Sequence, residues 1–481
     1  MPAMANAEHC RILLTPDWNE WRSKNANVTP DLTAADLSGR DLSGKDLKRA
    51  DLSRSDLSGA ALSGADLTRA TLRGSRFTGA SAPGAIFEHC DLDFLDLSKV
   101  FLAGSRMRSA SLQGCVLAGA DFAGADLTLT KLEGSDLAGA NLAGAILCDV
   151  NFRGVKMAGS QFDGADLSRS LFEGVSAMRG SFPNANFSGA NLKTADLTGS
   201  DLRRAKFVGA ILRQTSLSAA DCEGADFTEA DLELASAVET NFSGARFDRA
   251  RLRKSDLRRA LFLDAVGADV SFAEARLVEV DFRTARFERV NCQSADLSKA
   301  LLRRANLRPY TFIGARFTGA DAAEAIAEGV NFSRADISLS NFRQANLKRA
   351  NFSDCRAFDA DLSGTLLIGA NFRNANLQDA DLRFARAIGA DFAGAQLAGA
   401  DLANADLTEA IFKKTRVWGA TARRTKPPKG AGPLLWLSTL FSKAKEKKTK
   451  TADEKERARQ KRIAELEAAA EKKPPHLTGR R

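Results

Sequence analysis

Histidine and long apolar runs are scarce in this chain of 481 residues, and each shortage excludes a class of function. Three His leave no basis for a His-rich metal centre, and no run reaches the ~18 apolar residues that span a bilayer. The first residues do not combine a charged stretch with an apolar one, so we expect no secretory signal. Seven Cys without a CxxC pair fit a reducing compartment, which predicts a cytoplasmic protein.

Catalytic motifs are missing as well. The sequence has no phosphate-binding loop of the nucleotide-binding type, no HExxH and no GxSxG. His89 precedes Cys90, but Cys90 falls at a position that the repeat described below reserves for small inward residues, so we expect an inert thiol. The sequence therefore predicts that the protein is not an enzyme and uses no cofactor and no metal ion.

What the chain has instead is a repeat of five residues. From Leu32 to Val417 a mostly large apolar residue recurs every fifth position, which gives 78 units without an insertion or deletion. Of the 29 Phe, 24 occupy these positions, which we call centres. Two residues before the centre, a small residue stands in 73 of the 78 units. A period of five fits neither a helix nor a straight strand, so we predict a backbone that turns a corner every five residues and points the large and the small residue inward.

One such unit buries little alone, so stability has to come from stacking many of them. Tyr310 replaces a small inward residue after Pro309 and predicts a local bulge or kink. The centres that we expect to line the core include Leu37, Leu67, Phe122, Phe152, Phe187, Phe242, Phe282, Phe342 and Phe392.

Tandem A(D/N)LXX units such as ADLSG and RDLSG resemble those of the pentapeptide repeat family, and they cover most of the chain. The resemblance implies an all-β solenoid, namely a right-handed quadrilateral β-helix with four units per coil and about 19–20 coils. It would occupy residues 30–420. An N-terminal cap, residues 1–29, would use Trp18 and Trp21 to cover the first coil.

The positive charge is concentrated after the repeat. From Lys413 to the last residue the net charge is +14, whereas the preceding 412 residues carry −5. Residues 421–433 are predicted to be a linker, 434–450 an apolar segment followed by a polybasic run, and 451–481 a charged tail that is helical or disordered.

The apolar segment of the tail leaves three interpretations open. It caps the last coil, it anchors the chain peripherally in an anionic membrane surface beside the polybasic run, or it forms a homodimer contact. The side chains concerned are Leu434, Leu435, Trp436, Leu437, Leu440 and Phe441.

Outward charges supply a candidate interaction surface, formed by Arg246, Arg249, Arg251, Arg253, Lys254, Arg258 and Arg259. Direct binding of nucleic acid is not expected, because no continuous basic stripe is present in the repeat.

We predict a rigid, non-enzymatic scaffold of a bacterial cytoplasm that binds protein partners, with a basic tail that tethers it to a membrane or an acidic partner. The alternative that the resemblance implies is a DNA mimic that binds a topoisomerase and protects gyrase from quinolones. A charge of only −5 over 412 residues disfavours that alternative.

Overall fold

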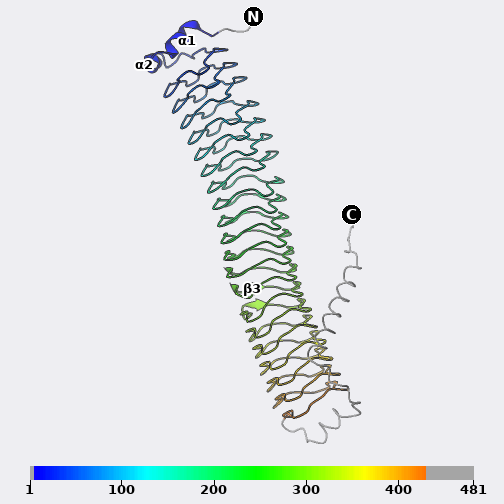
Figure 1. The fold of residues 1–481 in the computed structure, drawn as a ribbon. Helices are drawn as coiled ribbons and strands as arrows, with labels where there is room; N and C mark the ends of the chain where they lie inside the picture. Colours follow the sequence, from blue (N-terminus) through cyan, green and yellow to red (C-terminus); the bar gives the residue numbers. More distant parts are fainter. Residues whose placement is uncertain (1–4, 429–481) are drawn as a thin grey trace, which may run out of the picture. The chain divides into compact units, whose positions relative to one another are not determined.

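The computed structural model of the chain describes residues 5–428, in which two short helices precede a long series of turns (Figure 1). The described residues form two compact units: unit 1 runs to Asp256 and includes Asp264–Gly267, and unit 2 comprises Leu257–Leu263 and the residues from Ala268 on. None of the described helices is long and apolar enough to cross a membrane. The elements are α1 (Ala7–Leu13), α2 (Trp18–Lys24), β1 (Val266–Ala268), β2 (Arg286–Glu288), β3 (Val290–Asn291) and β4 (Tyr310–Thr311).

Backbone pairing links residues whose numbers differ by 20. Asp31 forms a parallel bridge with Asp51 in unit 1, and Asn331 forms one with Asn351 in unit 2. This offset corresponds to four five-residue units, so four units make one coil and successive coils pair with each other. The same offset joins Asp406 to Lys426, so the repeat continues beyond residue 420 into the segment that was predicted to be a linker.

Regular strands are short because a turn interrupts every extended stretch. The four strands have two or three residues each, and most other pairs between coils are isolated bridges. Within unit 2, β3 pairs with β4 in parallel. Of the predicted all-β architecture, the described part of the chain shows parallel pairing between coils and few, short strands.

Each corner is a turn closed by a hydrogen bond. The N–H of Ala35 donates to the carbonyl of Leu32 over 3.1 Å, and Ala34 between them has a φ of +56°. A positive φ at the third residue of a turn and not at the second is typical of type II. A positive φ recurs at this position in almost every described unit, with Pro309 as an exception because its ring fixes a negative φ. Glycines such as Gly39 and Gly44 fill the position often because glycine adopts a positive φ without steric cost.

Where an Asp or Asn precedes the centre, its side chain completes the hydrogen bonding of the corner. The N–H groups of Leu32 and Ala34 donate to carbonyls of the next coil, both over 2.8 Å. The N–H of Thr33 between them donates instead to Oδ1 of Asp31, over 3.1 Å. Such a side-chain acceptor is what Asp and Asn supply in turns. The Asp or Asn side chain of the motif therefore accepts from the one backbone N–H group of the unit that the pairing between coils and the turn do not satisfy.

The centres point inward and form apolar columns. All nine centres named above are at most 1% exposed. In unit 2, the rings of Phe332, Phe352 and Phe372 stack with centroid separations of 4.9 and 4.8 Å. In unit 1, Phe207 and Phe227 stack at 4.9 Å. These separations match the spacing of neighbouring strands, so identical centres one coil apart pack ring on ring.

Tyr310 does not produce the predicted bulge. Val290 pairs with Tyr310 and Asn291 with Thr311, so the register between the coils stays one to one. The Tyr310 side chain is 4% exposed and stacks on Phe312 with a centroid separation of 5.4 Å. The centre one coil before Phe312 is Cys292, whose small volume leaves room for the tyrosine ring.

Helices α1 and α2 cover the first coil of unit 1. That coil has no preceding coil to accept its N–H groups, and side chains of the helices replace it. The N–H of Asp31 donates to Nδ1 of His9 over 3.0 Å, and the N–H of Asp46 donates to Oδ1 of Asn19 over 2.8 Å. Trp18 is fully buried, and its Nε1 donates to the carbonyl of Asp46 over 2.8 Å. The helices therefore shield the exposed edge from pairing with other chains.

Acid should weaken the corners. Hydrogen bonds from the hydroxyl and the N–H of Ser38 lower the pKa of Asp36, and the pKa values of Asp41, Asp56 and Asp96 are lowered in the same way. A carboxylate whose folded pKa lies below its unfolded value contributes stability that is complete above the unfolded value, 3.8 for Asp36, and is lost as the pH falls through the folded value. We expect the melting temperature to fall between about pH 5 and about pH 2.

A variant with Asn at all four positions isolates this effect, because Asn keeps the acceptor oxygen and does not titrate. It should lose less melting temperature over the same pH range than the unsubstituted protein. Equal losses would show that these carboxylates do not support the corners.

Phe282→Asp should destabilise unit 2 strongly. The side chain is 1% exposed and its ring lies 4.9 Å from that of Phe262, so an aspartate would bury a charge without a partner. We expect a loss of at least about 3 kcal/mol in urea unfolding. The same substitution at Phe94, which is 78% exposed, should change the free energy of unfolding by less than about 0.5 kcal/mol. Similar effects at both sites would contradict the inward orientation of the centres.

Candidate functional site

Side chains that face solvent are ordered in columns. In a typical unit the residue before the centre and the two residues after it are partly or fully exposed, whereas the centre and the small residue are buried. Because four units complete one coil, residues whose numbers differ by 20 lie above one another. Any binding surface has to be built from these columns.

The predicted basic surface is largely neutralised by acidic residues on the same coil or an adjacent one. Lys254 and Arg258 take part in further interactions. A surface of alternating charges attracts polyanions less than an unpaired basic stripe would. The ion pairs are Arg246 with Asp248 (2.7 Å), Arg249 with Glu229, Arg251 with Asp231 (3.3 Å) and Arg253 with Glu233 (3.5 Å) in unit 1, and Arg259 with Glu279 (2.8 Å) in unit 2.

Two phenylalanines occupy the corner position with positive φ and extend into solvent. Phe94 in unit 1 has a φ of +63° and is 78% exposed, and Phe384 in unit 2 has a φ of +60° and is 61% exposed. A bulky residue is uncommon in this region of backbone space, which costs roughly 1–2 kcal/mol for residues with a side chain. Neither burial nor backbone preference explains a phenylalanine at these corners.

The ring of Phe94 lies against the next coil. A Cβ added to Gly114, which occupies the same corner of that coil, would come within 2.7 Å of two ring carbons of Phe94, so only glycine leaves the space that the ring fills. Both phenylalanines present an exposed aromatic face at a corner of the repeat, which suits an anchor for a partner.

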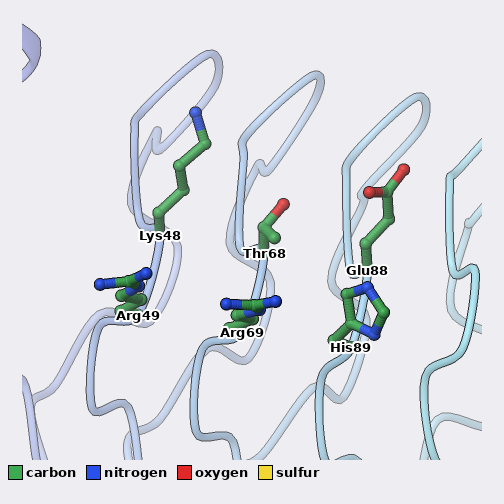
Figure 2. Close-up of a pocket in the computed structure, with 6 residues that line it drawn as sticks. All are labelled: Lys48, Arg49, Thr68, Arg69, Glu88 and His89. Carbon is green, nitrogen blue, oxygen red and sulfur yellow. The ribbon is translucent and has the colours of Figure 1, made fainter.

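A shallow groove of about 330 Å³ crosses three successive coils of unit 1. Figure 2 shows its side chains in two rows, with one residue of each row contributed by each coil. Lys48 in the groove pairs with Asp66 over 3.1 Å, and Glu88 pairs with Arg106 over 2.9 Å. The first row contains Lys48, Thr68 and Glu88, and the second contains Arg49, Arg69 and His89.

Sequence reasoning missed the groove and the exposed phenylalanines. The signal was available for both: Arg49, Arg69 and His89 hold the same position in every fourth unit, and Phe94 and Phe384 are among the few Phe that do not fall on a centre. Recognising them requires the four-unit coil, which shows which outward residues become neighbours.

The buried cysteines do not form a catalytic site. Burial raises the pKa of Cys90 and of Cys115 to about 12, and the Cys90 thiol donates to the carbonyl of Leu67 over 2.9 Å. Burial also raises the pKa values of Cys222, Cys292 and Cys355. A thiol that stays protonated near neutral pH is a poor nucleophile. Among residues 5–428, no three His, Cys, Asp or Glu side chains are grouped so that they could hold a metal ion.

The apolar segment 434–441 and the charged tail 451–481 lie outside the described residues, so their three interpretations stay predictions. Near the end of the described repeat, the centres Phe412 and Val417 are only half-buried.

Comparisons with known proteins agree with the repeat architecture. The family model of pentapeptide repeats matches segments between residues 31 and 426, and the model of a pentapeptide repeat region matches residues 105–182. Neither describes an enzyme. No curated protein matches the chain.

Three solved structures illustrate what the chain is similar to. HetL from the cyanobacterium Nostoc is 31% identical over 47% of this chain and 88% of its own, with a TM-score of 0.20. The plasmid-mediated protein QnrB1 is 22% identical over 46% of this chain and 89% of its own, with a TM-score of 0.23. A protein of the Arabidopsis thaliana thylakoid lumen is 26% identical over 29% of this chain and 65% of its own, with a TM-score of 0.13. Because the family models match most of its length, the chain belongs to the pentapeptide repeat family.

Proposed function

We propose that the protein is a non-enzymatic scaffold that binds protein partners on the outward columns of a right-handed quadrilateral β-helix. The pairing of residues one coil apart supports the four-sided coil. The observation that carries the proposed function is the exposure of Phe94 and Phe384 at corners with positive φ.

The energetics favour a binding role for these two side chains. Burying a phenylalanine contributes about 1.5–3 kcal/mol, and most Phe of this chain obtain that gain as centres. Phe94 and Phe384 forgo it and occupy a backbone region that disfavours them. Exposed apolar groups of this kind mark interaction sites, and aromatic residues dominate the energetics of many protein interfaces.

The family models and the buried thiols support a role without catalysis. The matching family models contain no enzyme, and the raised pKa values of the buried thiols fit the absence of cysteine chemistry.

The topoisomerase alternative receives less support. QnrB1 is a fluoroquinolone resistance protein, but at 22% identity its likeness concerns the fold alone. Acidic residues of unit 2 that could imitate phosphates are paired with arginine. Arg383, for example, contacts Asp381 at 2.6 Å and Asp401 at 3.8 Å. Such pairing reduces the negative potential that a DNA mimic needs.

Photo-crosslinking tests the proposed anchors in cells. With p-benzoylphenylalanine at position 94 or 384, illumination should produce covalent adducts with a partner. Lys99 and Asn404 provide matched control positions, because each occupies an equivalent exposed corner with positive φ.

Once a partner is identified, Phe94→Gly and Phe384→Gly should each weaken its binding by about 30-fold if both are hot spots, since these are worth at least about 2 kcal/mol. Glycine relieves the backbone strain, so loss of folding would not explain the effect. Adducts of equal yield at all four positions, or unchanged affinity of both variants, would contradict the proposal.

Gyrase assays separate the two functions. We expect the purified protein to leave supercoiling by gyrase, and its inhibition by quinolones, unchanged at micromolar concentrations, because its outward acidic residues are interleaved with arginine. Dose-dependent protection of gyrase would reverse the ranking in favour of the DNA mimic.

A further inference from the structure

The groove of unit 1 carries positive charge that the chain itself does not balance. We propose that it binds a phosphate dianion, either inorganic phosphate or a phosphate monoester, between the guanidinium groups of Arg49 and Arg69. Two observations support this site: which arginines of one corner column form ion pairs, and which charged residues around the groove do.

Among the described residues, six arginines occupy the corner column that contains Arg49 and Arg69, and one of them, Arg349, lies between Gly329 and Gly369 of the same column. Three times an arginine in this column pairs with an acidic residue one coil earlier. In contrast, Arg49, Arg69 and His89 place three basic side chains on three successive coils without an acidic residue among them. The three pairs are Asp149 with Arg169 (2.7 Å) and Glu229 with Arg249 in unit 1, and Asp269 with Arg289 (2.6 Å) in unit 2.

The acidic residues around the groove are already engaged. Asp66 pairs with Lys48 over 3.1 Å, and Glu88 pairs with Arg106 over 2.9 Å. No ion pair joins Arg49 or Arg69 to a carboxylate anywhere in residues 5–428. Two like charges therefore remain on neighbouring coils, at about the 4.8 Å spacing of paired strands.

A phosphate dianion fits this arrangement in charge and geometry. Near pH 7 a phosphate monoester carries a charge of about −1.5 to −2, which balances two guanidinium groups, whereas one carboxylate balances only one. Guanidinium groups donate paired hydrogen bonds to phosphate oxygens. Figure 2 shows Arg49 and Arg69 side by side in one row. The hydroxyl of Thr68 in the other row already donates to Oδ1 of Asp66 over 2.6 Å, so the two guanidinium groups are the donors of the proposed site.

Calorimetric titration of the full-length chain tests the site with two probes, inorganic phosphate and phenyl phosphate, at constant ionic strength. The double variant Arg49→Gly with Arg69→Gly should bind at least ten times more weakly than the unsubstituted chain. The double variant Arg169→Gly with Arg249→Gly is the matched control, since it removes the same charges from the same column where each is already paired. It should bind within about twofold of the unsubstituted chain.

Tighter binding of inorganic phosphate would identify the free ion as the ligand, and tighter binding of phenyl phosphate would identify an ester. No binding of either probe at millimolar concentrations, or equal weakening in both double variants, would overturn the proposal.

Thermal stability provides a second readout that does not depend on ligand affinity. Arg49→Glu places a carboxylate one coil before Arg69, as Asp149 lies before Arg169. Without phosphate this variant should melt at a higher temperature than the unsubstituted chain, because repulsion is replaced by attraction. Phosphate should raise the melting temperature of the unsubstituted chain and not that of the variant. A lower melting temperature of the phosphate-free variant would contradict the unbalanced charge on which the site depends.

Discussion

The backbone corner in every five-residue unit is the constraint on which the rest of this structure depends. It consists of a turn with a positive φ at its third residue and of an Asp or Asn oxygen that accepts the remaining N–H. Four corners complete one coil and bring the chain back to the side on which the coil began. Most of the remaining backbone N–H groups therefore donate to carbonyls of adjacent coils. Because the corners repeat, large centres one coil apart lie at the spacing of neighbouring strands and stack into apolar columns.

Much of the fold could be predicted because the five-residue period is visible without coordinates. Leu37 and Phe282 are buried because every fifth residue faces the axis, whichever coil it belongs to. The period alone does not give the number of sides, which depends on pairing between coils. For the same reason the pairing of Arg249 with Glu229 was not predicted. The prediction of a bulge at Tyr310 was wrong because the small side chain of Cys292, a centre of the preceding coil, leaves the volume that the tyrosine ring fills.

The division between inward and outward positions also explains how such a fold acquires function. The inward residues are buried in every coil, whereas the residues at the corners differ from coil to coil. Phe94, Phe384 and the Arg49–Arg69 pair all stand at corners, where they change the chemistry of the surface without changing the core. Sequence reasoning had favoured the cluster around Arg246–Arg259, where the density of arginine is greatest, but there the coils supply acidic partners as well. Which charges remain unpaired is decided by residues on the adjacent coils.

Cysteine pairing tests the four-unit coil most directly. Ala118 and Ala138 are equivalent outward residues on adjacent coils, and the N–H of Gly119 donates to the carbonyl of Ala138 over 2.9 Å. With cysteine at both positions, mild oxidation should form a disulfide that mass spectrometry detects, since neighbouring coils bring the two Cα atoms within bonding range. Cysteines at positions 118 and 143, which are separated by one unit more and so lie on different sides of the coil, should stay reduced. A disulfide in the second variant and none in the first would contradict the stacking of every fourth unit.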